Sequence, residues 1–424
     1  MSAVDPDTQP VEASETTPLL TDTPEAKSKQ ITPLPRLQLF IICLIRITEP
    51  MCFQVIFPFI NQMLLDVGAV KNPETVGYAA GVVESIFSIT QLLTVFHWGT
   101  LSDRIGRKPV LVMGCVGSAI SAVSLGLSRS FVAIVISRCL SGIMNGNIAV
   151  LKSIMGEISD ETNESRAFSF FPLCLNIGIL IASSIGGTFG DARSFPKLLS
   201  ALPFLKTFPY LLPNFLASLF PIAAAVAAIL YLKETLPPKK APVTEDGNES
   251  QEPAEPEITS YKALFTPHIN ALMFSFAILS LVAGAQLALV PLFCFTPVSN
   301  GGLGFGEADI GNAMSIRAVS TIAVQLFAFP ALQRRFGSLR LFRYLMILWI
   351  PSFVLLPFGN VLARANKPAL VWVSLSSSLI LSAIANMAFV CNLLMTNAAA
   401  PSRHLLGAIN GEDYKEPMSH SSET

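Results

Sequence analysis

Charged residues are scarce in this chain, which has 424 residues of which only 13% are Asp, Glu, Lys or Arg. A soluble domain with 51% hydrophobic residues and so little charge would expose far too much apolar surface. The formal net charge is −1, so no global electrostatic argument favours binding to nucleic acid. The composition therefore predicts an integral membrane protein, with the lipid bilayer as its surroundings and no nucleic acid partner.

Clusters of metal-binding residues are also missing from the sequence. The four histidines do not group with the seven cysteines, which lie within apolar runs and form no Cys-x-x-Cys pair, as expected of packing residues. The glycine-rich stretch 301–306 lacks the Lys-Ser/Thr of a phosphate-binding loop, and no nucleophile elbow occurs. We therefore expect no enzyme activity, no cofactor and no metal site.

Long apolar runs are what the sequence has instead. A helix crosses a bilayer core with roughly 20 apolar residues. About ten runs reach this length, so we predict an all-α polytopic protein with kinks at Pro50 and Pro58 of the first span. The predicted spans are 37–65, 77–98, 110–127, 131–151, 168–189, 210–232, 269–295, 308–332, 341–358 and 370–395.

Polar segments divide these spans into two groups. The predicted domains are a disordered cytoplasmic tail (1–35), a six-helix bundle (36–232), a cytoplasmic linker (233–265), a bundle of about four helices (266–411) and a polar tail (412–424). Within the first tail, Glu15, Leu19 and Leu20 resemble an acidic dileucine sorting signal for vacuoles or lysosomes. The predicted location is therefore a vacuolar membrane or the plasma membrane.

The segment Gly99–Leu111 concentrates charge and glycine between the second and third spans, and we predict that it is a tight hinge. Short loops rich in Lys and Arg stay on the cytoplasmic side of a membrane. This loop therefore predicts that both termini lie in the cytosol.

The pattern Gly-x-x-x-Asp-Arg-x-Gly-Arg-Lys in this segment resembles the signature loop of the major facilitator superfamily. The resemblance implies two helical bundles around a central cavity, with gating roles for Gly99, Asp103, Arg104, Gly106, Arg107 and Lys108. The connection Gln333–Arg340 is a degenerate repeat of the same segment in the second bundle. The family has twelve spans, so the resemblance also implies that the last two helices are missing here.

Two opposite charges lie inside the first span, where a charge costs about 2.5–3.5 kcal/mol on insertion scales. Arg46 and Glu49 are three residues apart on one helix face, just before Pro50 and with Gln54 beyond. The pattern Arg-x-x-Glu-Pro resembles the zinc-induced-facilitator-like (tetracycline-resistance-like) branch of the drug:proton antiporters, which are found in fungi and plants. We predict that Glu49 couples protons or binds substrate; the alternative is a structural pair near the membrane edge.

The second and fourth spans carry further candidates. Glu84 and Gln91 share one stripe of the second span. In the fourth span, the small residues Gly142 and Gly146 follow Arg138 at four-residue intervals on one face, which favours close helix contact. Asn145 and Asn147 lie beside them. A fourth-span arginine has been implicated in proton coupling in the family, so the resemblance assigns that role to Arg138; docking of neighbouring helices is the alternative.

The remaining candidates lie in the fifth span and in the second bundle. The fifth span contains Asn176 and the pair Gly186-Gly187, which partly matches the family's antiporter signature but lacks its proline. Arg317 is a charge within a span of the second bundle and a candidate for the cavity wall.

Together these patterns predict a monomeric secondary transporter, and the absence of a nucleotide-binding motif argues against pumping by ATP. It would exchange a small organic solute or drug for protons by alternating access, as in multidrug efflux. The alternative is a truncated, non-transporting or regulatory membrane protein of the same family.

Overall fold

The computed structural model describes residues 32–160, 163–236 and 267–399, which form helices and no strand. The first half of the molecule runs to residue 236, and its described residues contain nine α-helices. They are α1 (Arg36–Gln54), α2 (Ile60–Asp66), α3 (Val76–Ile105), α4 (Arg107–Gly126), α5 (Phe131–Met144), α6 (Asn147–Ile158), α7 (Glu164–Phe189), α8 (Pro196–Ala201) and α9 (Leu211–Tyr231).

The second half begins at residue 267, after a stretch that lies outside the described residues. Its helices are α10 (Pro267–Phe295), α11 (Glu307–Ala323), α12 (Phe329–Phe336), α13 (Ser338–Arg364), α14 (Pro368–Ala385) and α15 (Met387–Ala399). A π-helical turn, Val324–Ala328, joins α11 to α12.

Ten helical stretches of the described chain are long and apolar enough to cross a membrane. Six lie in the first half and four in the second, as the sequence predicted. Many large apolar side chains on their outer faces are exposed, among them Leu281 (73%) and Phe327 (80%). Exposed apolar rings and methyl groups are stable where lipid, rather than water, surrounds them.

Three predicted spans are broken in the structure: the first, the fourth and the tenth, of which the tenth is interrupted at Asn386 between α14 and α15. The first was predicted as one helix, yet α1 ends at Gln54 and α2 begins at Ile60, with Pro58 in the turn between them. The fourth is interrupted between α5 and α6, so Gly146 does not continue the helical face of Arg138 and Gly142. The first break lies in an apolar stretch, so hydropathy does not mark it. The fourth span does contain a turn signal, Asn145-Gly146, but the apolar residues on both sides keep the average hydropathy high.

The predicted hinge at 99–111 is much shorter in the structure. Helix α3 continues through Asp103 to Ile105, and α4 begins at Arg107. Only Gly106 leaves the helical conformation, with φ at +107°, a region that favours glycine. The predicted gating residues other than Gly106 therefore stand on two rigid helix ends rather than in a loop.

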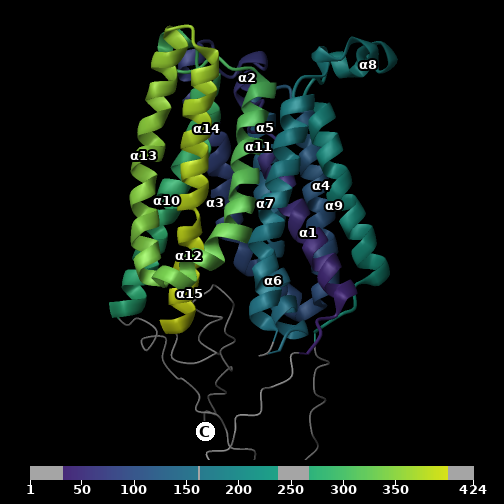
Figure 1. The fold of residues 1–424 in the computed structure, drawn as a ribbon. Coiled ribbons are helices and arrows are strands. Elements are labelled where there is room, and N and C mark those ends of the chain that lie inside the picture. Colours follow the sequence, from purple (N-terminus) through teal and green to yellow (C-terminus); the bar gives the residue numbers. More distant parts are fainter. Residues whose placement is uncertain (1–31, 161–162, 237–266, 400–424) are drawn as a thin grey trace, which may run out of the picture.

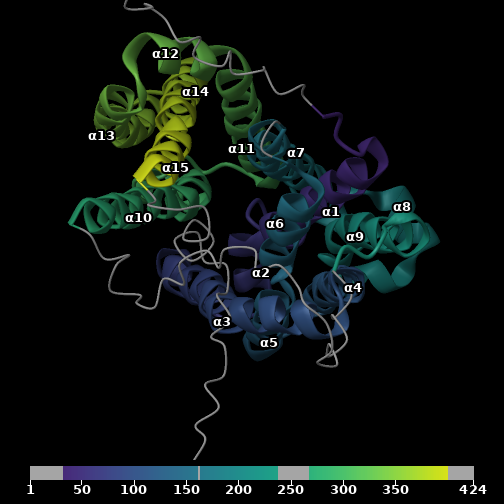
Figure 2. The ribbon, with the colours of Figure 1, turned by 90° about the horizontal axis from the view of Figure 1, so that it is seen from below.

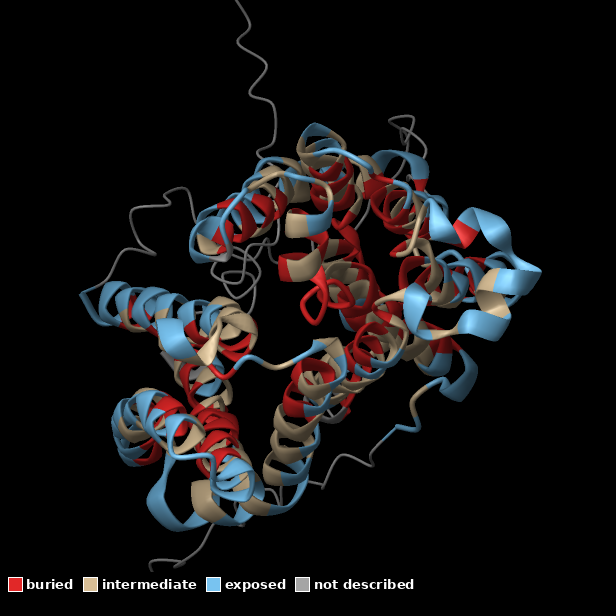
Figure 3. Ribbon diagram, turned by 90° about the horizontal axis from the view of Figure 1, so that it is seen from above, coloured by how far each residue is buried: buried red, intermediate tan, exposed pale blue. Residues whose placement is uncertain are grey.

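We call the end of the molecule near α6 and α15 the lower end and the end that carries α8 the upper end (Figure 1). Helix α3 begins at the upper end beside α2 and runs down to Gly106, where α4 begins. Viewed from below, the helices of the second half form one group and those of the first half another, with α11 beside α7 (Figure 2). Buried residues lie on the faces that helices turn toward one another, and exposed residues lie on the periphery (Figure 3).

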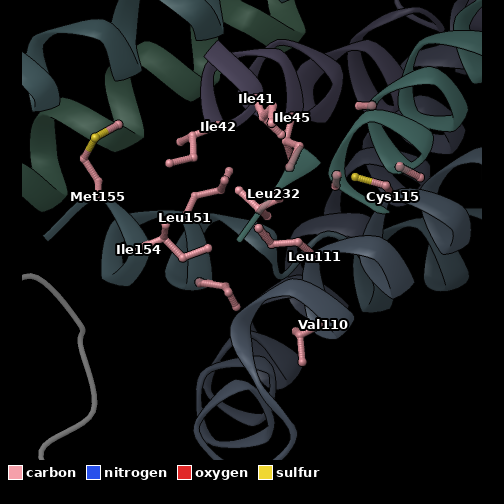
Figure 4. Close-up of a cluster of buried hydrophobic side chains, with 14 of the residues drawn as sticks. Ile41, Ile42, Ile45, Val110, Leu111, Cys115, Leu151, Ile154, Met155 and Leu232 are labelled. Atoms are coloured by element: carbon pink, nitrogen blue, oxygen red, sulfur yellow. The ribbon is translucent and has the colours of Figure 1, made fainter. Parts of the chain in front are cut away.

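The lower end of the first half has its own apolar core. Side chains from α1, α4 and α6 meet there with Leu232, which follows α9 (Figure 4). Ile42, Val110, Leu111 and Leu151 are fully buried in this cluster. Burying such a side chain stabilises the fold by about 1.5–3 kcal/mol, so the helix ends beside Gly106 rest on a rigid base.

Candidate functional site: buried charges and the bundle interface

The Gly106 turn is held by a carboxylate from the end of the sixth span. Glu234 accepts hydrogen bonds from the backbone N–H groups of Arg107 (2.8 Å) and Lys108 (3.1 Å), at the start of α4. A Cβ atom added at Gly106 would lie 2.6 Å from Glu234 Oε2, so glycine also makes room for this contact. Although partial burial opposes ionisation, four backbone N–H groups hold the pKa of Glu234 below its usual range.

Arg107 joins three helices at the lower end. Its guanidinium pairs with Asp103 on α3 (2.8 Å) and with Glu157 on α6 (3.1 Å), and it donates to Ser102 Oγ (2.6 Å). Lys108 donates to the backbone carbonyl of Ile229 at 2.8 Å. All these partners belong to the first half, so the network fixes the shape of that half.

The other two residues of the predicted gate make no such contacts. Arg104 is exposed and has no side-chain partner among the described residues, and Gly99 lies inside α3. Neither Glu157 nor Glu234 was predicted from the sequence. The sequence contains only a weak indication of these two residues. Each carboxylate lies just past a predicted span, where charged residues that contact only water are common.

Arg46 and Glu49 form an ion pair on α1, with side chains that are only 12% and 7% exposed. The Arg46 guanidinium also lies over the Phe171 ring of α7, 5.7 Å from its centre, while its Nε atom is buried without a partner. The two charges of such a buried pair neutralise each other, but the pair does not satisfy every hydrogen-bond donor of the arginine.

Arg138 is more isolated than Arg46. It is 1% exposed, and its guanidinium carbon lies 4.8 Å from the centre of the Phe87 ring on α3. Its Nε and Nη1 atoms have no hydrogen-bond partner among the described residues. Glu84 on α3 interacts with Arg138 electrostatically without forming a direct ion pair, and both polar atoms of buried Gln54 are also unpaired.

The remaining polar candidates of the first half hold helices together. Gln91 on α3 donates to the backbone carbonyl of Asn145 at 2.9 Å, in the break between α5 and α6. A Cβ atom at Gly142 would lie 2.0 Å from Thr90 Oγ1, and one at Gly146 would lie 2.0 Å from the Trp98 ring. Buried Asn147 lies against Cys115 of α4, with its Oδ1 atom unpaired.

The two halves meet along α7 and α11. Gly187 and Gly311 touch so closely that a Cβ atom at Gly187 would lie 2.6 Å from the Gly311 Cα. Ser184 and Ser315 are joined by a hydrogen bond of 3.3 Å, and farther down Asn176 donates to Gln325 at 3.4 Å.

Gly186 does not face the second half but lies against Val55, in the turn between α1 and α2. A Cβ atom added at Gly186 would lie 2.2 Å from the carbonyl oxygen of Val55. Arg317 is half-buried on α11, and its side chain has no hydrogen-bond or ion-pair partner among the described residues.

A hydrogen bond from Asn300 to Glu74 (3.2 Å) also joins the halves at the upper end. Within the described ranges, no hydrogen bond or ion pair connects the halves below Asn176 and Gln325. Among the described residues, the hydrogen bonds between the halves therefore lie at the upper end and down to the level of Asn176.

A second charge cluster, which the sequence did not reveal, lies at the upper end of the first half. Asp66, at the end of α2, pairs with Arg193 and accepts a hydrogen bond from Tyr210 at 2.8 Å. Burial opposes ionisation of Asp66, but these two partners hold its pKa below the usual value. Burial and the Asp66 carboxylate raise the pKa of Tyr210.

The sorting signal predicted at Glu15, Leu19 and Leu20 lies outside the described residues, as do most of the predicted tails and linker. Among the residues that the structure describes, no group of His, Cys, Asp and Glu side chains could hold a metal ion.

Comparison with known sequences decides the family. The sequence pattern of the Major Facilitator Superfamily matches residues 42–411. The chain belongs to the major facilitator superfamily. It is therefore a transporter by family and not an enzyme, as the Gly99–Leu111 segment predicted.

Two relatives represent the branches that the sequence suggested. The "Major facilitator superfamily multidrug transporter mfsB" of Aspergillus fumigatus is 28% identical, over 88% of this chain and 74% of that protein. The Arabidopsis thaliana "Protein ZINC INDUCED FACILITATOR 1" is 25% identical, over 89% of this chain and 80% of that protein.

Among solved structures, the fold is similar to a bacterial homologue of the human lysosomal transporter Spinster in an inward-facing and unoccupied conformation. The TM-score is 0.63 at 16% identity, covering 89% of this chain and 79% of that chain. At this level of identity the likeness shows the fold alone.

Proposed function

We propose that this chain exchanges a small organic solute or drug for protons by alternating access, with Glu49 as the proton-binding group. The observation that carries the proposal is the buried pair of Arg46 and Glu49, together with buried Arg138 of the first half, whose Nε and Nη1 atoms have no partner among the described residues. Ionisable groups at membrane depth are costly, and they mark proton or substrate pathways more often than they serve packing.

The contacts between the halves support the rocking part of the proposal. Closure at one end and separation at the other is what one state of an alternating-access cycle requires. If the Lys- and Arg-rich Gly106 end faces the cytosol, as short cationic connections do, this state is open to the cytosol. The relative named as a multidrug transporter supports a drug-like substrate.

A proton can drive the cycle only if it favours one conformation over another. Protonation of Glu49 would leave Arg46 as a buried cation that has lost its ionic partner. Since an unpaired buried charge costs several kcal/mol, the protonated state would favour a conformation in which Arg46 reaches water or substrate.

The test is uptake of ethidium, a drug-like cation, into liposomes that contain the purified full chain and an acidic interior. Wild-type protein should accumulate ethidium, and nigericin, which collapses the pH gradient, should abolish the accumulation. Glu49→Gln should reduce gradient-driven uptake at least tenfold while leaving ethidium exchange at equal pH measurable.

The matched control is Asp309→Asn, which removes a carboxylate that has no hydrogen-bond or ion-pair partner in the part of the chain that the structure describes. Gradient-driven uptake at the wild-type rate in Glu49→Gln would exclude Glu49 as the coupling group. Uptake that persists in nigericin would overturn the antiport mechanism itself.

A further inference from the structure

A pocket of about 210 Å³ lies where the two halves meet in the upper part of the molecule, apart from the Arg46–Glu49 pair. Its walls come from α2 and α3 of the first half and from α10 of the second half. The lining residues are Ile60, Asn61, Gly77, Ala80, Gly81, Glu84, Ala285, Ala288, Leu289, Pro291 and Leu292.

Two of these residues offer oxygen atoms that have no partner. Asn61 is 1% exposed, and its Oδ1 atom accepts no hydrogen bond among the described residues. The Glu84 carboxylate likewise forms no hydrogen bond or ion pair within the described chain; Arg138, on α5, acts on it electrostatically without a direct contact. Glu84 is half-buried in a largely apolar wall, where an ionised carboxylate is costly unless it is paired, so this residue points to a cationic ligand.

The remaining lining is apolar, and this restricts the chemistry of the ligand. An anion would be repelled by the Glu84 carboxylate, which is the one charged group in the pocket wall. Divalent Ca²⁺ takes six to eight oxygen ligands, whereas the pocket offers a single carboxylate and a single amide side chain. An ammonium group can pair with the Glu84 carboxylate, while a small hydrocarbon body fills the space between α3 and α10.

We propose that this pocket binds a small protonated amine with an apolar body, and that the bound amine clamps the two halves together at the upper end. The clamp rests on the rocking motion proposed above, whereas the binding site stands without it.

We infer the clamp because the walls of the pocket come from both halves of the molecule. Gly77 lies against Leu292 so closely that an added Cβ atom would be 2.9 Å from Leu292 Cδ2, and the Glu74–Asn300 hydrogen bond also joins the halves at the upper end. Separation of the halves at this end would take α10 away from α3 and open the pocket. A ligand that needs both walls binds only the closed arrangement and stabilises it by its differential affinity.

The binding test uses benzylammonium as the probe and benzyl alcohol as its neutral analogue, with the purified full chain in detergent. Benzylammonium should bind saturably and raise the melting temperature, and benzyl alcohol should not. Glu84→Gln keeps the side-chain shape but removes the charge, so it should weaken benzylammonium binding at least tenfold. Ala288→Leu should weaken it by filling the pocket from the other half.

The matched control is Ser85→Ala, the exposed neighbour of Glu84 on α3 that does not line the pocket. It should bind benzylammonium as the wild type does. Equal affinity for benzylammonium in wild type and Glu84→Gln, or equal affinity of the wild type for benzyl alcohol, would overturn the amine site.

The clamp is tested with spin labels at Glu74→Cys and Asn300→Cys, in a background in which the half-buried Cys43 and Cys139 are alanine and the other cysteines are buried. Benzylammonium should increase the fraction of short label distances, and in ethidium uptake it should lower the maximal rate without raising KM. An unchanged or longer distance, or purely competitive inhibition, would overturn the clamp. A failure of proton coupling in the ethidium assay would leave both the binding and the distance results standing.

Discussion

The lower end of the first half and the interface at the upper end hold the molecule in different ways. At the lower end, Arg107 forms ion pairs with carboxylates on α3 and α6, and Glu234 accepts a hydrogen bond from the backbone at the start of α4. At the upper end, the halves meet through glycine backbones and single hydrogen bonds, as between Gly187 and Gly311 and between Ser184 and Ser315, and no ion pair joins them among the described residues. Charge stabilises one half internally, whereas close packing joins the two halves.

This difference has a mechanical meaning. Ion pairs with defined geometry resist local rearrangement, so the lower network keeps the first half rigid while it moves as a unit. Contacts between glycine surfaces bury little side chain and can separate without leaving a buried charge behind. The upper interface therefore suits reversible opening.

Gly187→Leu should have the largest effect, because its side chain would enter the space occupied by Gly311. Overpacking of a tight contact costs about 1–3 kcal/mol or more, and here the cost falls on the closed arrangement. We expect at least a tenfold loss of ethidium uptake and a lengthened distance between labels at Glu74 and Asn300.

The comparison variant for this test is Gly284→Ala on α10, where an added Cβ atom meets nothing within 4 Å. This variant should leave both the ethidium uptake and the distance between the labels unchanged. Normal uptake and an unchanged label distance in Gly187→Leu would show that the upper interface does not close through this contact.

Arg107→Gln should have a smaller effect, on the stability of the first half. The change leaves Asp103 and Glu157 without their shared cation, at positions that are about one fifth exposed (20% and 23%). We expect a loss of about 2 kcal/mol in the free energy of unfolding, measured by denaturant titration in detergent.

Arg104→Gln, in the same turn of the chain, provides the control because Arg104 is exposed and forms no such pairs. It should change stability by less than about 0.5 kcal/mol. If the two substitutions lower the free energy of unfolding equally, the ion pairs of Arg107 do not stabilise the first half.

Asp66→Asn should have the smallest of the three effects and should depend on pH. Arg193 and Tyr210 depress the pKa of Asp66, so its contribution is fully present above the unfolded pKa of about 3.8 and is lost as pH falls through the folded pKa. The variant should be about 1 kcal/mol less stable at pH 7, where the carboxylate is partly screened by solvent. The difference should shrink as pH approaches 3; a difference that stays constant from pH 7 to 3 would contradict an ionic role.

Sequence reasoning found the features that depend on composition over a long window. The ten spans follow from apolar runs, and the family follows from the spacing of Asp103, Gly106 and Arg107. The break after Gln54 could not be read in the same way, because the turn buried there is apolar. The break after Met144 carries the turn signal Asn145-Gly146, but the apolar residues around it gave the appearance of one continuous span.

Contacts between distant residues were the other features that sequence reasoning missed. Glu157, Glu234 and Arg193 each lie near the end of a span, and their partners are set by how the helices pack in three dimensions. The surroundings of Arg138 were missed for the same reason. Its residue type predicted a functional charge, but only the structure shows that it lies over the Phe87 ring and that its Nε and Nη1 atoms have no partner among the described residues.

The central claim is that the halves rock about the bundle interface, so that one end opens as the other closes. The most direct measurement compares label distances across the upper pair Glu74 and Asn300 with those across a lower pair, Arg104 on α3 and Arg340 on α13, over a range of pH. The account predicts that the fraction of short upper distances equals the fraction of long lower distances and that both change in step. Distances that lengthen at both ends together, or that never change, would contradict it.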